Sequence, residues 1–139
     1  MTASITHWSP ENQERAKAML EQYPEKRSAV MPLLYLASLE HEYVSDDAMR
    51  EVAELVGITP AQVHSVASFY TMFKHEPVGK YLVSVCTSIS CHLLDGESVL
   101  EAVEEASGVS HGETSDDGLF SVEHVECIGA CGGAVAVQV

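Results

Sequence analysis

Apolar residues in the first half of the chain recur at helical spacing, and residues that begin or end helices interrupt them. Ser9 and Pro10 supply an N-cap and a first helical position, which predicts a helix from Glu11 to about Tyr23. Pro24 then ends this helix. Further helices are predicted from about Val30 to Tyr43, from Ser45 to Gly57, and from Thr59 toward Phe69.

The ends and faces of these helices are also marked. Thr59 and Gln62 form a capping box around Pro60, and Gly57 is the expected C-terminal stop of the preceding helix. The apolar positions expected to face the core are Leu33, Leu36, Ala37 and Leu39 in the second helix and Val52, Leu55 and Val56 in the third. We therefore expect residues 1–76 to be helical.

The pattern changes after a Pro- and Gly-containing linker over residues 74–80. A short β-rich run over 81–85 leads directly into Cys86, and a second one over 120–125 precedes Cys127. Between them we expect one amphipathic helix that begins near Ser90 and ends at Gly108, with Gly96 as a weak point. A last strand is expected over 134–139. The expected fold class is α+β, with a small α/β domain over residues 77–139.

The composition, 46% hydrophobic and 20% charged residues in 139, is that of a folded soluble protein. No apolar run approaches the length of a membrane span, so we expect no direct membrane insertion. Residues 1–9 contain no Lys, Arg or apolar block, so we expect neither a secretory signal nor a transit peptide. These features favour a bacterial-type cytoplasm, where thiols stay reduced and available for metals.

Charge is distributed unevenly along the chain. The formal net charge is −14, and all seven Lys and Arg lie in the first 80 residues together with 11 acids, a net charge of −4 there. Residues 81–139 hold ten acids and no Lys or Arg, a net charge of −10. Such a surface repels nucleic acid and anionic lipid, and it favours a basic protein partner. Acidity that only maintains solubility remains the alternative.

The four cysteines form two pairs, each directly after a predicted strand. Cys86 and Cys91 have C-x4-C spacing, and Cys127 and Cys131 have C-x3-C spacing. Two neighbouring strands would bring both loops to one end of the sheet, so four sulfurs could converge on a metal or a cluster. Zinc sites mostly use C-x2-C pairs, and disulfides conflict with a reducing compartment. The spacing therefore favours a [2Fe–2S] cluster, with structural zinc as the main alternative and four unrelated thiols as the weakest.

The residues around the cysteines fit such a site. Ile128, Gly129 and Ala130 are small enough for backbone N–H groups to approach sulfur, and glycine tolerates positive φ. Cys91, near a helix start, is expected to be stabilised as a thiolate by the helix dipole. His92 and His124 lie near cysteines in sequence, but ordinary surface roles are favoured for both. The aromatic stretch Phe69–Phe73 is expected to pack in the core or between domains.

Several motifs resemble those of a known family, the thioredoxin-like [2Fe–2S] subunit of NADH dehydrogenase, which is the small partner of the flavin subunit in respiratory complex I. Related subunits occur in NAD-linked formate dehydrogenases and NAD(P)-linked hydrogenases. The motifs are Ser68–Phe73, Pro77–Lys80, Val85–Cys91 and Val125–Gly132, so the resemblance covers nearly the whole chain.

The resemblance implies a helical bundle followed by a thioredoxin-like domain, with one [2Fe–2S] cluster on Cys86, Cys91, Cys127 and Cys131. It implies an electron-transfer subunit of an NADH:quinone oxidoreductase rather than a complete enzyme. FMN and NADH would be bound by the partner, a flavin-containing NADH-oxidising subunit within a larger redox complex. That complex would place the chain peripherally on the cytoplasmic face of the inner membrane. A free-standing ferredoxin is a further alternative, against which the helical first half argues.

The chain departs from the family pattern in two places. Relatives usually have Pro a few residues after the last cysteine, where this chain has Ala134, Val135 and Ala136. Relatives also generally continue into a further C-terminal segment, so a short family member or a truncated chain is expected at Val139.

Overall fold

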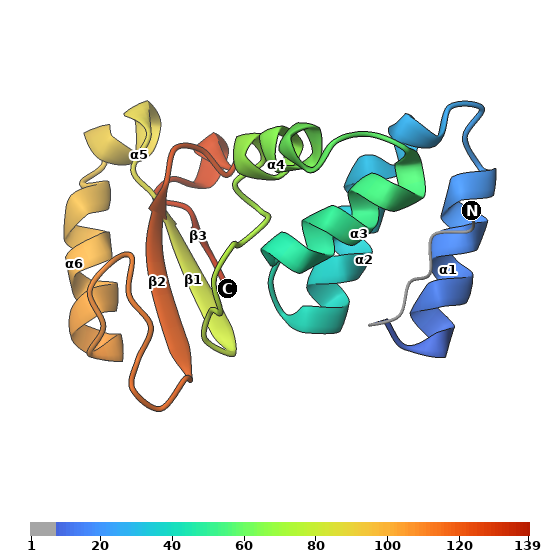
Figure 1. Cartoon of the computed structure of the whole chain (residues 1–139). Coiled ribbons are helices and arrows are strands. Elements are labelled where there is room, and N and C mark those ends of the chain that lie inside the picture. The colour runs from blue at the N-terminus through green and yellow to red at the C-terminus, as the bar shows by residue number, and fades with distance from the viewer. Residues whose placement is uncertain (1–7) are drawn as a thin grey trace. The chain divides into compact units, whose positions relative to one another are not determined.

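The computed structural model describes residues 8–139, and the chain divides between Pro77 and Val78 into two compact units (Figure 1). We expected no targeting signal in residues 1–9. Residues 1–7 of this segment lie outside the described part of the chain. Each unit has its own hydrophobic core and is described by itself.

The first unit is helical, as predicted. Its elements are α1 (Pro10–Glu21), a short 3₁₀ turn η1 (Lys26–Ala29), α2 (Val30–His41), α3 (Asp46–Val56) and α4 (Pro60–Phe69). The predicted caps are present: the Ser9 hydroxyl accepts from the Asn12 N–H, and Thr59 and Gln62 form the capping box of α4. Gly57 ends α3 in the left-handed conformation, with φ +75°, a conformation that glycine adopts without a Cβ penalty.

Helix α2 contacts the other three helices and carries the centre of this unit's core. Leu33 and Leu34 are fully buried on it. The prediction that Leu39 shares this buried face is wrong, because Leu39 is exposed. It lies six residues beyond Leu33, about 240° around the helix, and therefore faces away from the core.

The second unit is a three-stranded mixed sheet with helices, which confirms the α+β class. Its elements are β1 (Tyr81–Cys86), α5 (Ile89–Leu93), α6 (Gly96–Ser107), β2 (Phe120–Val125), a 3₁₀ turn η2 (Cys131–Gly133) and β3 (Val137–Gln138). The strand order is β2-β1-β3, with β1 parallel to β2 and antiparallel to β3. Helix α6 packs on β1 and β2, where Leu100 meets Val85 and Val122 in the core.

Two expectations about this unit need correction. The single helix predicted from Ser90 to Ser107 is two helices, because Asp95 has φ +65° and breaks the helical path before Gly96. The last strand is only Val137–Gln138 rather than residues 134–139. Residues 134–136 instead form a loop beside the buried cysteines, and the Ala136 carbonyl accepts from the Cys86 N–H at 2.9 Å.

Among the helices of residues 8–139, none combines the length and apolar character needed to cross a bilayer.

Candidate metal centre

The sheet topology brings the two cysteine loops to the same end of the sheet, as the sequence predicted. Strands β1 and β2 lie side by side (Figure 1). They run parallel in a register that sets Cys86 beside Val125. Cys86 is the last residue of β1, and Cys127 follows Val125 by two residues. Cys91 lies in α5, which follows β1, and Cys131 begins the η2 turn.

Two of the four cysteines are buried and the other two are exposed. Cys86 and Cys91 are 3% and 2% exposed and pack in a small apolar cluster with Ala136. Cys127 and Cys131 are exposed, and all four cysteines are free of disulfides. The centre therefore has an inner edge held by the fold and an outer edge open to solvent.

Backbone N–H groups are directed at the sulfurs from three segments: Ser88, residues 128–129 and Ala136. The Gly129 N–H donates to Cys127 Sγ at 3.3 Å, and the φ of +78° that this loop requires at Gly129 is one that glycine readily adopts. The Cys86 sulfur receives hydrogen bonds from the N–H groups of Ser88 and Ile128. The Gly129 contact fits the expectation of a close backbone approach at a small residue, whereas Ser88 was not expected as a donor. Each of these hydrogen bonds favours the thiolate form.

The two buried thiols have opposite pKa shifts. The Ser88 N–H, then the Cys91 side chain and the Ile128 N–H, lower the pKa of Cys86, and together they outweigh burial and the nearby Glu126 charge. For Cys91, the Ala136 N–H lowers the pKa, but burial together with the neighbouring Cys86 and Cys131 sulfurs outweighs it, and the pKa is raised. The expected helix-dipole stabilisation of the Cys91 thiolate is therefore wrong: α5 has only five residues, and Cys91 is buried beside other sulfurs.

Within residues 8–139, no three His, Cys, Asp or Glu side chains are arranged to hold a single metal ion. The two histidines considered from the sequence have other neighbours. His92 Nδ1 lies 3.9 Å from a Glu97 carboxylate oxygen, and His124 Nδ1 lies 3.4 Å from Thr87 Oγ1.

Gly96 is a residue of the site that sequence reasoning identified only as a weak point in a helix. A Cβ at this position would lie 3.0 Å from the carbonyl oxygens of both Cys86 and Cys91. The first turn of α6 therefore packs directly on the backbone of the two inner cysteines. The only sequence signal for this close approach was the glycine itself.

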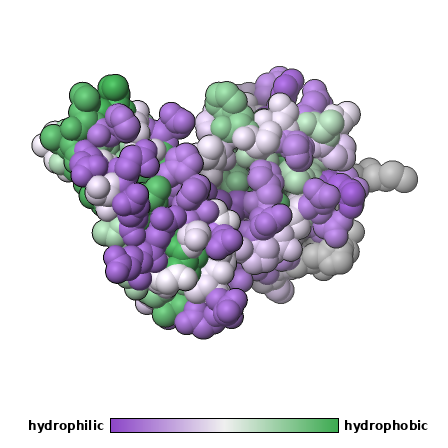
Figure 2. All heavy atoms as spheres, turned by 90° about the vertical axis from the view of Figure 1, so that its left-hand side faces the viewer, coloured by the Kyte–Doolittle hydropathy of each residue, from purple (hydrophilic) through white to green (hydrophobic). Residues whose placement is uncertain are grey.

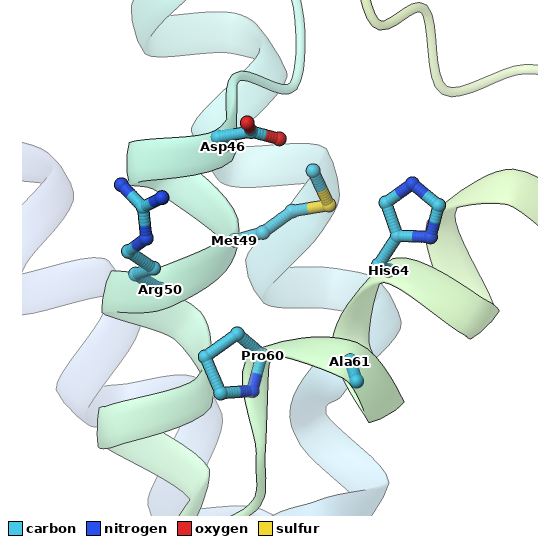
Figure 3. A pocket seen from close by; sticks show the side chains of 6 residues that line it. All are labelled: Asp46, Met49, Arg50, Pro60, Ala61 and His64. Atoms are coloured by element: carbon cyan, nitrogen blue, oxygen red, sulfur yellow. The ribbon is translucent and has the colours of Figure 1, made fainter.

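A small hollow in the helical unit is separate from the cysteines. It has a volume of about 200 Å³ and lies between α3 and α4, as Figure 3 shows. Asp46, Arg50 and His64 give it polar walls, but Arg50 is held by Asp47 at 2.6 Å. No group of ligating side chains gathers there among the described residues.

The aromatic stretch after α4 is mostly exposed, which corrects the expectation of core packing. Phe69 is 77% exposed, and Tyr70 and Met72 are exposed as well. Only Phe73 is buried, and it packs in the core of the helical unit. The helix ends at Phe69, so the residues that follow no longer keep the spacing of a buried stripe.

A profile of the thioredoxin-like [2Fe–2S] ferredoxin family matches residues 16–139. The chain belongs to this family. The match confirms the resemblance drawn from the motifs, and with it the thioredoxin-like character of the chain. It also supports an iron–sulfur cluster over structural zinc.

Curated relatives carry the names of NADH-quinone oxidoreductase subunits. The chain is 42% identical over 124 residues to one such subunit of Mycobacterium bovis, covering 89% of this chain and 49% of that protein. It is 39% identical over 126 residues to another of Rhizobium meliloti, covering 91% of this chain and 75% of that protein. These homologues are parts of an oxidoreductase complex, and this chain spans about half the length of the mycobacterial one.

A solved structure shares the fold at lower identity. The crystal structure of an NAD⁺-reducing [NiFe]-hydrogenase in the air-oxidized state superposes with a TM-score of 0.66 and 19% identity. The match covers 79% of this chain and 19% of the hydrogenase chain. At this identity the likeness concerns the fold alone.

Proposed function

We propose that this chain is an electron-transfer subunit that holds one [2Fe–2S] cluster on Cys86, Cys91, Cys127 and Cys131. The observation that carries the proposal is the convergence of two cysteine loops at one end of the parallel β1–β2 pair. The donor set fits the group, because iron–sulfur clusters are held by cysteine thiolates. Hydrogen bonds from backbone N–H groups to the sulfurs stabilise negative charge there.

When bound, such a cluster supplies one-electron exchange, and the protein contributes position and electrostatics. In this chain the inner thiols Cys86 and Cys91 are fixed by the sheet and α5. The outer thiols Cys127 and Cys131 lie at the surface, where a redox partner can approach. The surrounding chain therefore shields Cys86 and Cys91 from water and leaves Cys127 and Cys131 accessible to it.

The larger assembly is an NADH:quinone oxidoreductase of the complex I type. The proposed partner is the flavin-containing NADH-oxidising subunit, which binds FMN and NADH. Identity to NADH-quinone oxidoreductase subunits over most of this chain supports this assembly over a formate dehydrogenase or a hydrogenase. The complex would hold the chain at the cytoplasmic face of the inner membrane. Pull-down of the tagged chain, followed by identification of the co-purified proteins, separates these assemblies.

Anaerobic purification tests the cluster itself. A reddish-brown protein with iron and acid-labile sulfide in equal amounts is expected, and Cys86→Ser or Cys127→Ser should each lower the iron content. The control is Ser38→Ala on α2 of the helical unit, which also changes one small side chain and should leave the iron content unchanged. A colourless protein that holds one zinc ion on the same cysteines would refute the proposal.

A further inference from the structure

The helix between the first two cysteines exposes large apolar side chains to solvent. Ile89 and Leu93 of α5 are 70% and 75% exposed, and Leu94 at its end is 60% exposed. Ile89 and Leu93 are four residues apart and therefore lie on the same side of the helix. Figure 2 faces the α5 and α6 side of this unit and shows hydrophobic side chains gathered at its upper edge, where Figure 1 places α5. These three residues are called the α5 patch.

The exposure of the α5 patch is costly unless something covers it. Burying one Leu or Ile side chain is worth about 1.5–3 kcal/mol. Isolated apolar side chains on a surface are ordinary, but contiguous ones mark interaction sites. Three large exposed side chains fall within six residues of chain, and Figure 2 shows hydrophobic side chains gathered where α5 lies.

The α5 patch lies on the segment that also supplies an inner cysteine. Cys91 is buried from α5, while Ile89 and Leu93 on either side of it are exposed. The exposed Cys127 and Cys131 follow β2 at the same end of the sheet. A protein that covers the α5 patch would therefore lie against the cysteine centre.

Charge around the patch indicates what kind of surface fits it. Asp95 and Glu97 follow the patch directly, and Glu97 lies 3.9 Å from His92 on α5. Glu126 is close enough to Cys86 to raise the pKa of its thiol. No Lys or Arg occurs anywhere in residues 81–139. A second copy of this acidic unit would be repelled, whereas a surface with an apolar centre and a Lys and Arg rim would be attracted.

We infer that the α5 patch is the docking surface for the redox partner, a protein whose own surface is apolar at the centre and basic at the rim. The inference rests on the proposed function and deepens it, because it names the residues through which the flavin-containing subunit is held next to the cysteine centre. The apolar side chains supply affinity, and the acids supply steering and orientation.

The test compares polar substitutions in the patch with a matched substitution elsewhere in the same unit. The double variant Leu93→Gln/Leu94→Gln removes apolar surface from the patch without touching a cysteine. The control, Leu119→Gln, changes an exposed leucine that precedes β2 at the opposite end of the sheet. Each cluster-loaded chain is titrated against the purified flavin-containing NADH-oxidising subunit from the same cells by biolayer interferometry, at low and high salt.

The double variant is expected to keep the absorption and EPR spectra of the parent and to bind the flavin subunit at least about tenfold more weakly, as hot-spot residues do. The control should bind like the parent, and binding of the parent should weaken with salt. Equal affinity of the double variant and the control overturns the docking surface but leaves the cluster standing. The parent could also form a dimer that the double variant does not form, while both bind the flavin subunit equally. That result overturns the inference, because the α5 patch would then contact a second copy of this chain. A parent that carries its cluster but never binds the flavin subunit overturns both the surface and the proposed assembly.

Discussion

At Gly96 the first turn of α6 lies against the backbone of the two inner cysteines. An added Cβ would be 3.0 Å from the carbonyl oxygens of Cys86 and Cys91, which is tighter than ordinary contact. Neither oxygen belongs to a flexible side chain that could move aside at low cost. Gly96 therefore sets the distance between α6 and the segment that holds the inner thiols.

We predict that Gly96→Ala lowers the free energy of unfolding by about 1–3 kcal/mol, because overpacking outweighs the better helix propensity of alanine. It should also shift the EPR g values of the cluster-loaded protein, since the cysteine backbone must move. Thermal unfolding and EPR measure the two effects. The matched control is Ser98→Ala, which also places an alanine in the first turn of α6 but at an exposed position. A Gly96→Ala protein as stable as the control, with parental EPR, would contradict the close packing.

Residue-level chemistry at the cysteines could be predicted only in part from the sequence. The spacing indicated where the sulfurs lie, and the segment 128–130 was expected to supply N–H donors, but the donors Ser88 and Ala136 were not expected. The direction of the Cys91 pKa shift could not be predicted, because it depends on burial and on sulfurs brought in from distant segments. The position of Cys91 in a helix predicted a lowered pKa, which is the wrong direction. That prediction considers the helix dipole but leaves out the cost of burying a charged thiolate.

At the scale of elements, the carboxylate of Glu40 near the end of α2 holds the start of α1. It accepts from the Ser9 N–H at 2.8 Å and from the Ser9 hydroxyl at 2.9 Å, and the Asn12 side chain also donates to it. The hydrogen bond from Asn12, then those from Ser9, lower the pKa of Glu40 below its ordinary value of 4.5. The start of α1 and the end of α2, 31 residues apart in sequence, are thus joined through one ionised side chain.

We predict that this joint makes the stability of the protein depend on acid pH. Because the pKa of Glu40 is lowered on folding, its contribution is present above pH 4.5 and is lost as the pH falls through 4.5 to the lowered pKa of the folded state. Glu40→Gln should therefore lower the melting temperature at neutral pH, and the difference from the parent should shrink on acidification. Melting curves between neutral and acid pH measure this.

The control for this joint is Glu54→Gln, which removes the same charge from an exposed position on α3. It should change the melting temperature little at any pH. A Glu40→Gln protein whose deficit stays constant, or grows, as the pH falls would show that the ionised carboxylate is not what joins α1 to α2.

Elements with local signals were predicted well, and those set by distant contacts were not. The caps at Ser9 and Thr59 and the stop at Gly57 depend on residues close in sequence, so their signals are visible there. Gly96 marked a weak point in the predicted helix, but its close packing against the backbone of Cys86 and Cys91 joins segments that no local pattern relates. The shortening of β3 likewise follows from the use of residues 134–136 beside the inner cysteines.

At the scale of the whole molecule, the dominant feature is the separation of charge along the chain. Residues 81–139 carry a net charge of −10 and contain every cysteine. Reduction adds an electron to a centre that is already negative, so the acids around it should make reduction less favourable. Backbone N–H groups directed at the sulfurs act in the opposite direction.

Glu126 is the acid for which this effect should be most direct, because its charge already raises the pKa of the neighbouring Cys86 thiol. A unit charge at about 10 Å contributes on the order of 0.4 kcal/mol in water, about 20 mV for one electron. Glu126→Gln should therefore raise the reduction potential of the cluster-loaded protein by about 20 mV or more. Redox titration followed by EPR measures the potential.

Glu105→Gln is the comparison, since Glu105 is exposed toward the end of α6 that is far from Gly96. It removes the same charge from the same unit, so its smaller shift would isolate the effect of proximity. Replacing several acids between Glu97 and Glu126 together should raise the potential further, and high salt should reduce the contribution of the exposed ones. An unchanged potential in the multiple variant would mean that the backbone N–H groups, rather than the acidic surface, set the electrostatics of this centre.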